Sequence, residues 1–301
     1  MNSGSTVAVR FFFFTMSIVF LNGDFVEENE AKVSINDAGY YYGDGFYEVI
    51  LLYKGKMIDA NLHLNRLMKN FETLHFKNYP SRDKIVKIIN AVIERNKDIQ
   101  TAGVYLQFTR GCTPRTHEFV NLNLSPSILI KLNPCTIDEE NIKTWHCSIT
   151  EDPRRMHCDI KMISLLPMVM AKYDAENSGF DDVIFYNSRC HSITEGSHFN
   201  VAIVDKNGAI ITAPNGKELL PGCTRTRFIQ IAKDNGYMID ERYFSKQELL
   251  QANEVMALAS LKPIRAITKI DGIQIGDGKI GNVTKDLFDK FISFIKQSAD
   301  E

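Results

Sequence analysis

The sequence of 301 residues lacks the usual signatures of a metal-binding, nucleic-acid-binding or membrane protein. Its six cysteines include no Cys-x-x-Cys pair and its seven histidines no His-x-x-x-His pair, so their spacing predicts no metal site. The formal net charge is −2 and no block of like charges occurs, which removes the electrostatic case for a nucleic-acid partner. The cysteines are most simply explained as free thiols in a reducing compartment, so we expect a cytoplasmic protein.

One apolar stretch, residues 11–21, invites interpretation as a signal peptide, but it is too short to span a bilayer. Its second half runs into the turn Asn22-Gly23-Asp24, and this combination predicts a strand and hairpin of the folded protein. We therefore expect no membrane association. We take Met16 as the start of the folded chain and residues 1–15 as an N-terminal extension.

Apolar patterning predicts an α+β protein with a sizeable core, since hydrophobic residues make up 44% of the chain. The segments expected to be helical are 61–75, the stretch after Ser81, 166–177, 222–236 and 283–296. The segments expected to be strands are 46–53, 102–109, 128–132, 183–186, 201–204 and 254–259.

A polar segment that contains Pro134 divides the predicted elements into two groups. We expect an N-terminal domain over residues 16–133, a linker over 134–141 and a C-terminal domain over 142–301. The sequence contains no internal repeat and no low-complexity tract.

Lys161 and Glu195, in the second half, are the residues most suggestive of chemistry. Lys161 lies in the run 158–166, and Glu195 in Thr-Glu-Gly-Ser with Asn200 five residues further on. A lysine amine forms a Schiff base with an aldehyde, and a carboxylate can keep a pyridine nitrogen protonated so that the ring accepts electrons. Pyridoxal 5'-phosphate requires this division of labour from a protein. Taken alone, either residue would more often be a solvated charge, so the interpretation depends on the surrounding runs.

Six segments, in order along the chain, resemble those of the class IV aminotransferases, the fold type IV pyridoxal-phosphate enzymes. They are Gly43-Asp44-Gly45-Phe46-Tyr47-Glu48, His63-Leu64-Asn65-Arg66-Leu67, the run 109–117 (TRGCTPRTH), the runs around Lys161 and Glu195, and Leu220-Pro221-Gly222-Cys223-Thr224-Arg225. The resemblance extends from about residue 16 to the C-terminus and within the class is closest to the D-amino-acid transaminases. It implies a two-domain α+β fold with a smaller N-terminal α/β domain and a larger, β-barrel-like, helix-bearing domain that binds the cofactor.

The resemblance also assigns roles around the cofactor. It implies that Lys161 forms the Schiff base and moves the substrate proton, that Glu195 pairs with the pyridine nitrogen, and that Arg66 binds the phosphate. Lys172 is the rival lysine, but it lies on a predicted helix beside Ala171 and Tyr173, and we expect it to be solvated. Its spacing alone would make Arg66 an exposed arginine of an amphipathic helix. Only the resemblance of the motif supports a role in binding the phosphate.

Two further segments are expected to complete the phosphate site. Cys223 and Thr224 begin a predicted helix, whose free N–H groups and dipole favour an anion. The resemblance places small hydroxyl residues in a loop that here reads Leu-Ala-Ser-Leu-Lys-Pro over 258–263, where Ser260 alone keeps a hydroxyl. Lys262 is an electrostatic candidate to compensate for this departure.

Arg115 and His117 form an Arg-x-His pair in a loop stiffened by Pro114. In D-amino-acid transaminases such a pair reaches over from the neighbouring subunit and, with a tyrosine that matches Tyr47, holds the substrate α-carboxylate. A guanidinium, an imidazole and a phenol can make several charge-assisted bonds to one carboxylate. Holding it on one side of the cofactor determines which enantiomer presents its α-hydrogen to Lys161.

These points predict a homodimer with shared active sites that transfers the amino group of a D-amino acid, with D-alanine the first choice, to 2-oxoglutarate. The products would be pyruvate and D-glutamate. Within the class, a branched-chain L-amino-acid aminotransferase and an aminodeoxychorismate-lyase-like enzyme remain alternatives. An inactive pyridoxal-phosphate-binding homologue is the alternative outside enzymes, and the presence of both Lys161 and Glu195 argues against it.

Overall fold

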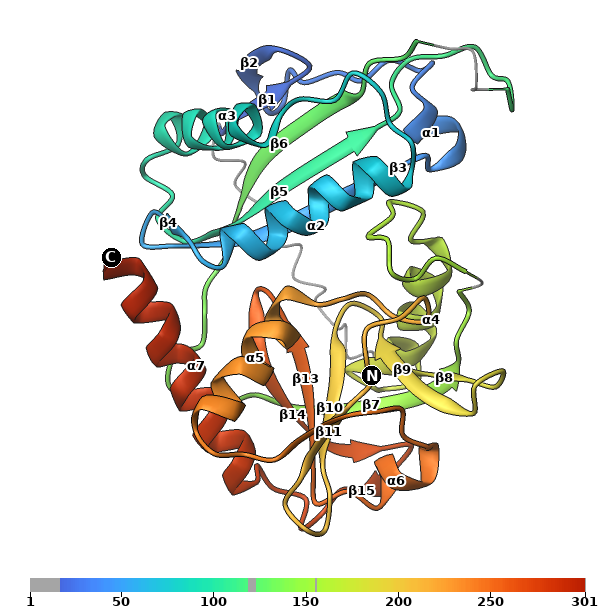
Figure 1. Ribbon diagram of the computed structural model, residues 1–301, viewed down its shortest axis with the longest axis vertical. Coiled ribbons are helices and arrows are strands. Elements are labelled where there is room, and N and C mark those ends of the chain that lie inside the picture. The colour runs from blue at the N-terminus through green and yellow to red at the C-terminus, as the bar shows by residue number, and fades with distance from the viewer. Residues whose placement is uncertain (1–16, 119–122, 155, 301) are drawn as a thin grey trace, which may run out of the picture.

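The computed structural model describes residues 17–118, 123–154 and 156–300. The expectations for residues 1–15 and for a start at Met16 lie outside the described residues. Figure 1 shows the N-terminal part above and the C-terminal part below, with the C-terminal helix running along one side. Each part is built around its own sheet, as the α+β expectation requires.

The N-terminal part is an antiparallel sheet in the order β2-β1-β6-β5-β3-β4. Its strands are β1 (Ile18–Leu21), β2 (Asp24–Glu27), β3 (Gly45–Tyr53), β4 (Lys56–Met57), β5 (Ala102–Thr109) and β6 (Ser127–Pro134). The short helix α1 (Ala38–Tyr42) precedes β3, while α2 (Ala60–Thr73) and α3 (Arg82–Arg95) cover the sheet. β5 has the predicted bounds. β6 is longer than predicted, because residues 133 and 134 continue the pairing with β5.

Helices α2 and α3 pack on this sheet because their apolar residues recur at helical spacing and face it. On α2 the buried residues Leu64, Leu67 and Phe71 join a core that includes Phe46 of β3 and Phe108 of β5. The Phe46 and Phe71 rings meet edge to face with centroids 4.8 Å apart. This packing fixes α2 against β3, and both elements contribute residues to the pocket described below.

The C-terminal part is a sheet that closes on itself, because β10 pairs with both β13 and β9. Its strands are β7 (Thr144–Glu151), β8 (Asp182–Asn187), β9 (Ser192–Gly196), β10 (Asn200–Val204), β11 (Ile210–Thr212), β12 (Ile239–Glu241), β13 (Glu254–Ala259), β14 (Lys262–Ile270) and β15 (Ile273–Gln274). The closure makes the barrel-like domain that the resemblance implied, and it brings the end of β9 next to the start of β10.

In the described part of the chain, four helices accompany the barrel: α4 (Leu166–Asn177), α5 (Cys223–Asp234), α6 (Lys246–Leu250) and α7 (Asn282–Asp300). α5 and α7 pack together against a buried apolar cluster of the barrel, and α4 lies against β8. α4 begins and ends where predicted, and Gly179 follows it with φ 84°, the left-handed conformation expected of glycine just past a helix. α7 extends beyond the predicted residues 283–296.

The connection between the two parts, residues 135–143, contains neither helix nor strand. A second contact joins the parts through the chain after Ile160, which crosses to β3. There the Tyr47 N–H donates to the Lys161 carbonyl at 2.9 Å, and the Ile163 N–H donates to the Gly45 carbonyl at 3.1 Å. A Cβ at Gly45 would lie 2.5 Å from the Phe108 carbonyl oxygen, so this crossing depends on glycine.

Candidate active site

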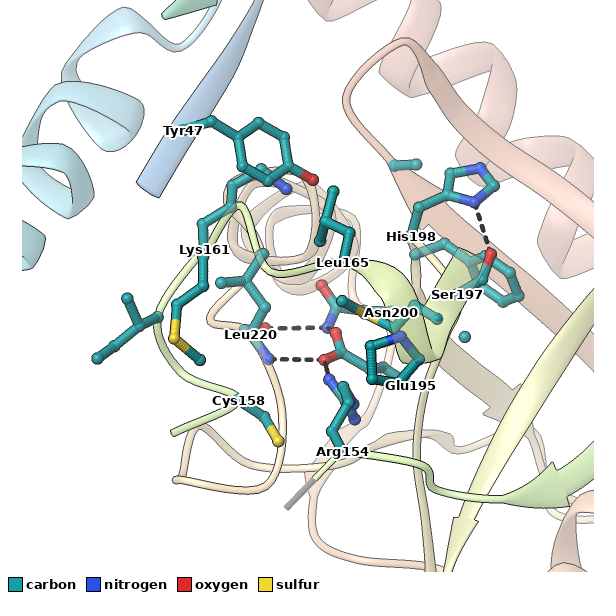
Figure 2. Close-up of a pocket in the computed structure, with 18 of the residues that line it drawn as sticks. Tyr47, Arg154, Cys158, Lys161, Leu165, Glu195, Ser197, His198, Asn200 and Leu220 are labelled. Carbon is teal, nitrogen blue, oxygen red and sulfur yellow. Dashed lines mark hydrogen bonds and ion pairs between the residues drawn. The ribbon is translucent and has the colours of Figure 1, made fainter. Parts of the chain in front are cut away.

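A pocket of about 400 Å³ opens between the two parts of the molecule, and both contribute to its walls. Seven of the residues singled out from the sequence line it: Tyr47, Arg66, Lys161, Glu195, Cys223, Thr224 and Ser260. Figure 2 shows Tyr47 and Lys161 side by side on one wall, with Glu195 at the base. Fold closure therefore gathers residues that are far apart in the sequence into one cavity.

Lys161 lies next to Tyr47, and the backbone hydrogen bond from the Tyr47 N–H to the Lys161 carbonyl holds the two residues together. The Lys161 Nζ is 4.3 Å from the centroid of the Tyr47 ring, a cation–π distance. Lys172, the rival lysine, is on α4 instead and its Nζ binds Asp182 at 3.1 Å and Glu176 at 2.9 Å. Lys172 does not line the pocket, so the geometry favours Lys161 as the reactive amine.

Glu195 lies near the end of β9, and its carboxylate is buried. Oε1 accepts the Leu220 N–H at 3.1 Å and Oε2 accepts the Asn200 side-chain amide at 3.3 Å. Burial raises the pKa of Glu195, and the Arg154 guanidinium, the Leu220 N–H and Lys161 offset part of that rise. Asn200 also donates to the Leu220 carbonyl at 3.0 Å, so it ties the carboxylate to the loop before α5.

Arg154 is a site residue that the sequence analysis did not identify. It donates to Glu195, and it binds Asp152 through Nε at 2.9 Å and Nη2 at 2.7 Å. One guanidinium thus faces two carboxylates, which leaves the cluster with one excess negative charge at the base of the pocket. A protonated pyridine nitrogen beside Glu195 would balance that charge. No local pattern marks Arg154, because its contact with Glu195 exists only once β7, β8 and β9 have paired.

The far end of the pocket has the chemistry of a phosphate site. Gly222 is the N-cap of α5 and supplies no side-chain cap. Within the described chain, no backbone or side-chain acceptor takes the N–H groups of Cys223 and Thr224. The Thr224 hydroxyl lies 3.4 Å from the Ser260 hydroxyl, so both face the same space. Free N–H groups at a helix N-terminus, with hydroxyls beside them, form an anion site.

Arg66 is buried on α2. Its spacing alone would have predicted an exposed arginine. It binds Glu48 through Nε at 2.6 Å and Nη2 at 2.8 Å, and donates from Nη1 to the Pro221 carbonyl at 2.8 Å. These bonds occupy three of its five N–H donors and leave two for a ligand in the pocket. Burial raises the pKa of Glu48, but the Arg66 and His63 partners outweigh it and bring the pKa to about 2.

Arg115 and His117 do not line the pocket of their own chain. They lie beside Tyr42, whose ring centroid is 5.9 Å from the Arg115 guanidinium carbon and 5.6 Å from the His117 ring. The Tyr42 hydroxyl donates to the Thr116 carbonyl at 3.1 Å and so holds the loop against α1. Of the three residues assigned to the α-carboxylate, the chain's own pocket therefore contains Tyr47 alone.

Within the described residues, no helix has the length and apolar character needed to cross a membrane, and no group of three or more His, Cys, Asp or Glu side chains could hold a metal ion.

Comparison with known proteins identifies the family. Residues 45–270 match the family described as amino-transferase class IV. The chain belongs to the class IV aminotransferases. A D-alanine aminotransferase of Staphylococcus haemolyticus is 33% identical over 282 residues, which cover 93% of this chain and 99% of the relative. One from Listeria monocytogenes is 34% identical over 94% of this chain and 98% of the relative.

Solved structures show the same fold. The branched-chain amino acid aminotransferase of Escherichia coli superposes with a TM-score of 0.85 at 23% identity, covering 92% of this chain and 94% of that one. A hypothetical aminotransferase from Mycobacterium tuberculosis in a PLP-bound form gives a TM-score of 0.80 at 16% identity, over 93% of this chain and 99% of that one. The α+β, two-domain fold type IV architecture expected from the sequence is confirmed.

Proposed function

We propose that the protein is a pyridoxal-5'-phosphate-dependent aminotransferase that moves the amino group of a D-amino acid, D-alanine in the first place, to 2-oxoglutarate. The products are pyruvate and D-glutamate. The observation that supports this proposal most is the loop 109–117, whose Arg115 and His117 are suited to hold an α-carboxylate. The full-length D-alanine aminotransferase relatives support the same substrate class.

The residues of the pocket fit the cofactor. The α5 N-terminus, Thr224, Ser260 and the two remaining N–H groups of Arg66 suit a phosphate, and the negatively charged base at Glu195 suits a protonated pyridine nitrogen. Lys161 lines the same pocket. When bound, the cofactor supplies an electron sink for the bonding electrons of the substrate α-carbon.

The protein's own residues then perform the proton transfer and the positioning. Lys161 Nζ takes the proton from the substrate α-carbon and returns it to the acceptor, and Tyr47 beside it limits the directions in which the amine can move. Arg154 and Asn200 keep the Glu195 carboxylate in place. Arg115 and His117 hold the α-carboxylate so that the D-enantiomer presents its hydrogen to Lys161.

This assignment requires a homodimer, because Arg115 and His117 lie away from the pocket of their own chain. α4 supports such an assembly. Its residues Leu166, Val169, Met170 and Tyr173 recur at helical spacing, so they share one face, and they are 70%, 56%, 48% and 57% exposed. An exposed apolar helix face is characteristic of an interaction surface. Leu166 also lines the pocket, so a partner on this face would lie next to the active site.

A donor panel that pairs each D-amino acid with its L-enantiomer, with 2-oxoglutarate as acceptor and the 2-oxo acid product as readout, tests the proposal. We expect turnover of D-alanine and little of L-alanine. Preference for L-leucine or L-valine would instead identify the branched-chain activity. The free cysteines of the structure support a reducing, cytoplasmic location as part of the same proposal.

A further inference from the structure

One corner at the edge of the pocket brings together two nitrogen-bearing side chains to which the proposed chemistry gives no role: His198, which lines the pocket, and Lys262, which does not. His198 lies between β9 and β10, lines the pocket, and has a side chain that is 41% exposed. Lys262 begins β14, directly after the turn that carries Ser260. Both flank Trp145: its ring centroid is 6.1 Å from that of His198 and 5.4 Å from the Lys262 Nζ. In Figure 2 His198 lies across the pocket from Tyr47 and Lys161.

Lys262 is a cation without a matching anion. Lys262 is exposed, and within the described ranges of the chain no carboxylate lies within ion-pair distance of its Nζ. Asp182, the acidic group that acts on it, is bound by Lys172 at 3.1 Å. Partial burial lowers the pKa of Lys262, the positive charges of Arg265, Lys172 and Lys143 lower it further, and Asp182 opposes them in part. An anion placed here would therefore relieve both the repulsion and the desolvation.

Lys262 does not join the phosphate site, contrary to its candidacy from the sequence. Its neighbour on the turn, Ser260, faces Thr224 at the start of α5. Lys262 turns toward Trp145 on β7 instead. Arg66, Thr224 and Ser260 line the pocket, and Lys262 does not. The anion that suits Lys262 is thus separate from a phosphate held by Arg66 and α5.

Hydrogen bonding orients His198 toward the pocket. The Ser197 hydroxyl has a single hydrogen and donates it to Asp182 Oδ1 at 2.6 Å. The contact of 2.8 Å between Ser197 Oγ and His198 Nδ1 then requires that Nδ1–H be the donor. Nε2 is left for a ligand. The charged groups that face His198 are Asp182, which favours its protonation, and Lys172, Lys262 and Lys161, which together with burial lower its pKa.

We propose that Lys262 and His198 bind the second carboxylate of dicarboxylic substrates, an acidic amino acid or its 2-oxo acid. The inference rests on the proposed aminotransferase function and assigns the residues that recognise its acceptor. Lys262 supplies the charge, and His198 donates from Nε2 once the bound carboxylate has drawn a proton onto it. A substrate with one carboxylate, such as D-alanine, does not use this corner.

The main test measures kcat/KM for D-glutamate and for D-alanine with the holoenzyme. Because a hydrogen bond to a charged group contributes enough free energy for a tenfold effect, Lys262→Met should lower the ratio of kcat/KM for D-glutamate to kcat/KM for D-alanine by about 10-fold or more. His198→Phe, which keeps a ring against Trp145, should lower the ratio in the same direction. Lys269→Met, an exposed lysine of the same strand, serves as the matched control and should leave the ratio as in the wild type.

Competitive inhibition by glutarate and by butyrate provides a binding readout without turnover. Glutarate should bind more tightly than butyrate to the wild type, and Lys262→Met should remove this preference. Because a dianion raises the lowered pKa of His198, glutarate binding takes up a proton. Its affinity should therefore fall as the pH rises, and this component of the pH dependence should disappear in His198→Phe.

Two results would overturn the inference while leaving the proposed function intact. The first is an unchanged ratio of kcat/KM for D-glutamate to kcat/KM for D-alanine in Lys262→Met. The second is a loss of cofactor affinity in that variant with equal losses of kcat/KM for both substrates, which would make Lys262 a phosphate ligand. Failure of the wild type to transaminate any D-amino acid would instead overturn the proposed function. In that case, a preference of the wild type for glutarate over butyrate that Lys262→Met abolishes would still support the carboxylate site.

Discussion

The guanidinium of Arg154 lies against the carboxylate of Glu195 at the base of the pocket. Asp152 holds the opposite side of the guanidinium, so Arg154 cannot swing away without giving up two further bonds. The pKa of Glu195 is raised by burial, and Arg154 is the largest influence that opposes the rise. A protonated Glu195 could not hold a proton on a pyridine nitrogen. We therefore infer that Arg154 is a positioning residue that favours the ionised form of Glu195.

Replacing Arg154 by methionine should raise the pKa of Glu195 further. Glu195 would then stay protonated to a higher pH, so the acidic limb of the kcat/KM profile should move to higher pH, and the activity should recover in part as the pH rises. Arg154→Lys retains a charge without the fork and should shift the limb less. A pH profile of Arg154→Met that is lowered evenly, with its acidic limb in the wild-type position, would show that Arg154 has only a structural role.

Lys161→Ala should abolish transamination while the protein still folds, because the side chain projects into the pocket and only its backbone ties the two sheets together. Loss of a general acid–base alone lowers turnover by at least ~10²-fold. Lys172→Ala is the matched control and should retain activity, since that lysine pairs with Asp182 outside the pocket. Borohydride treatment followed by peptide mapping should label Lys161 in the wild type. Label on Lys172 would reverse the assignment.

Arg115→Ala should lower kcat/KM for D-alanine at least ~10-fold, because hydrogen bonds from a guanidinium to a carboxylate are worth roughly 1.5–3 kcal/mol each. The visible absorbance of the bound cofactor should stay nearly unchanged, since Arg115 does not line the chain's own pocket. Arg82→Ala, which removes an exposed arginine that binds Asn61 and Asn65 on α2, is the control for general effects of losing a guanidinium.

Mixing two defective proteins tests whether Arg115 acts in the partner's pocket. In a mixed dimer of Lys161→Ala and Arg115→Ala subunits, one site would receive Lys161 from one chain and Arg115 from the other. With random exchange in a two-fold dimer, roughly a quarter of the wild-type activity should return after unfolding and refolding the two together. Activity that stays at the sum of the separate variants would show that Arg115 serves its own chain or none.

Local patterns were enough to predict α4, β5 and β13 to the residue, because each is a continuous apolar or helical run with a clear boundary. The gathering of Tyr47, Arg66, Lys161 and Glu195 in one pocket was expected from family motifs only. Nothing in the spacing of these residues encodes a contact between α2 and a barrel.

Three features in and around the site depend on tertiary structure and could not be predicted. The partnership of Arg154, which follows β7, with Glu195 on β9 arises when both strands pair with β8. The direction of Lys262 follows from its pairing opposite Ala259 across the turn, which sends its side chain to Trp145 and not to Thr224. The burial of Arg66 likewise requires Glu48 on β3, a residue that belonged to a recognised motif without an assigned role.

The buried network of Glu48, His63 and Arg66 should make stability depend on pH at both ends of the scale. Burial alone would lower the pKa of His63, but hydrogen bonds to Cys223 and Glu48 raise it to about 9, above its ordinary 6.5. The stabilisation from His63 is then fully present below pH 6.5 and is lost as the pH rises through 9. The pKa of Glu48 is about 2 against an ordinary 4.5, so its contribution is present above 4.5 and is lost as the pH falls through 2.

The alkaline side of this dependence is the more accessible experiment. Between pH 6.5 and 9 the wild type should lose stability by at most about 3 kcal/mol through His63, a bound that the raised pKa sets. The midpoint of urea unfolding, measured at pH 6 and pH 9 with the cofactor content held constant, reports this loss. His63→Asn removes the titrating ring and should show a much smaller difference between the two pH values. His146→Asn, at an exposed position of β7, is the matched control and should keep the wild-type difference.

If His63→Asn loses as much stability as the wild type between pH 6 and 9, His63 is not charged in the folded protein. The positive charge beside the phosphate site would then come from Arg66 alone.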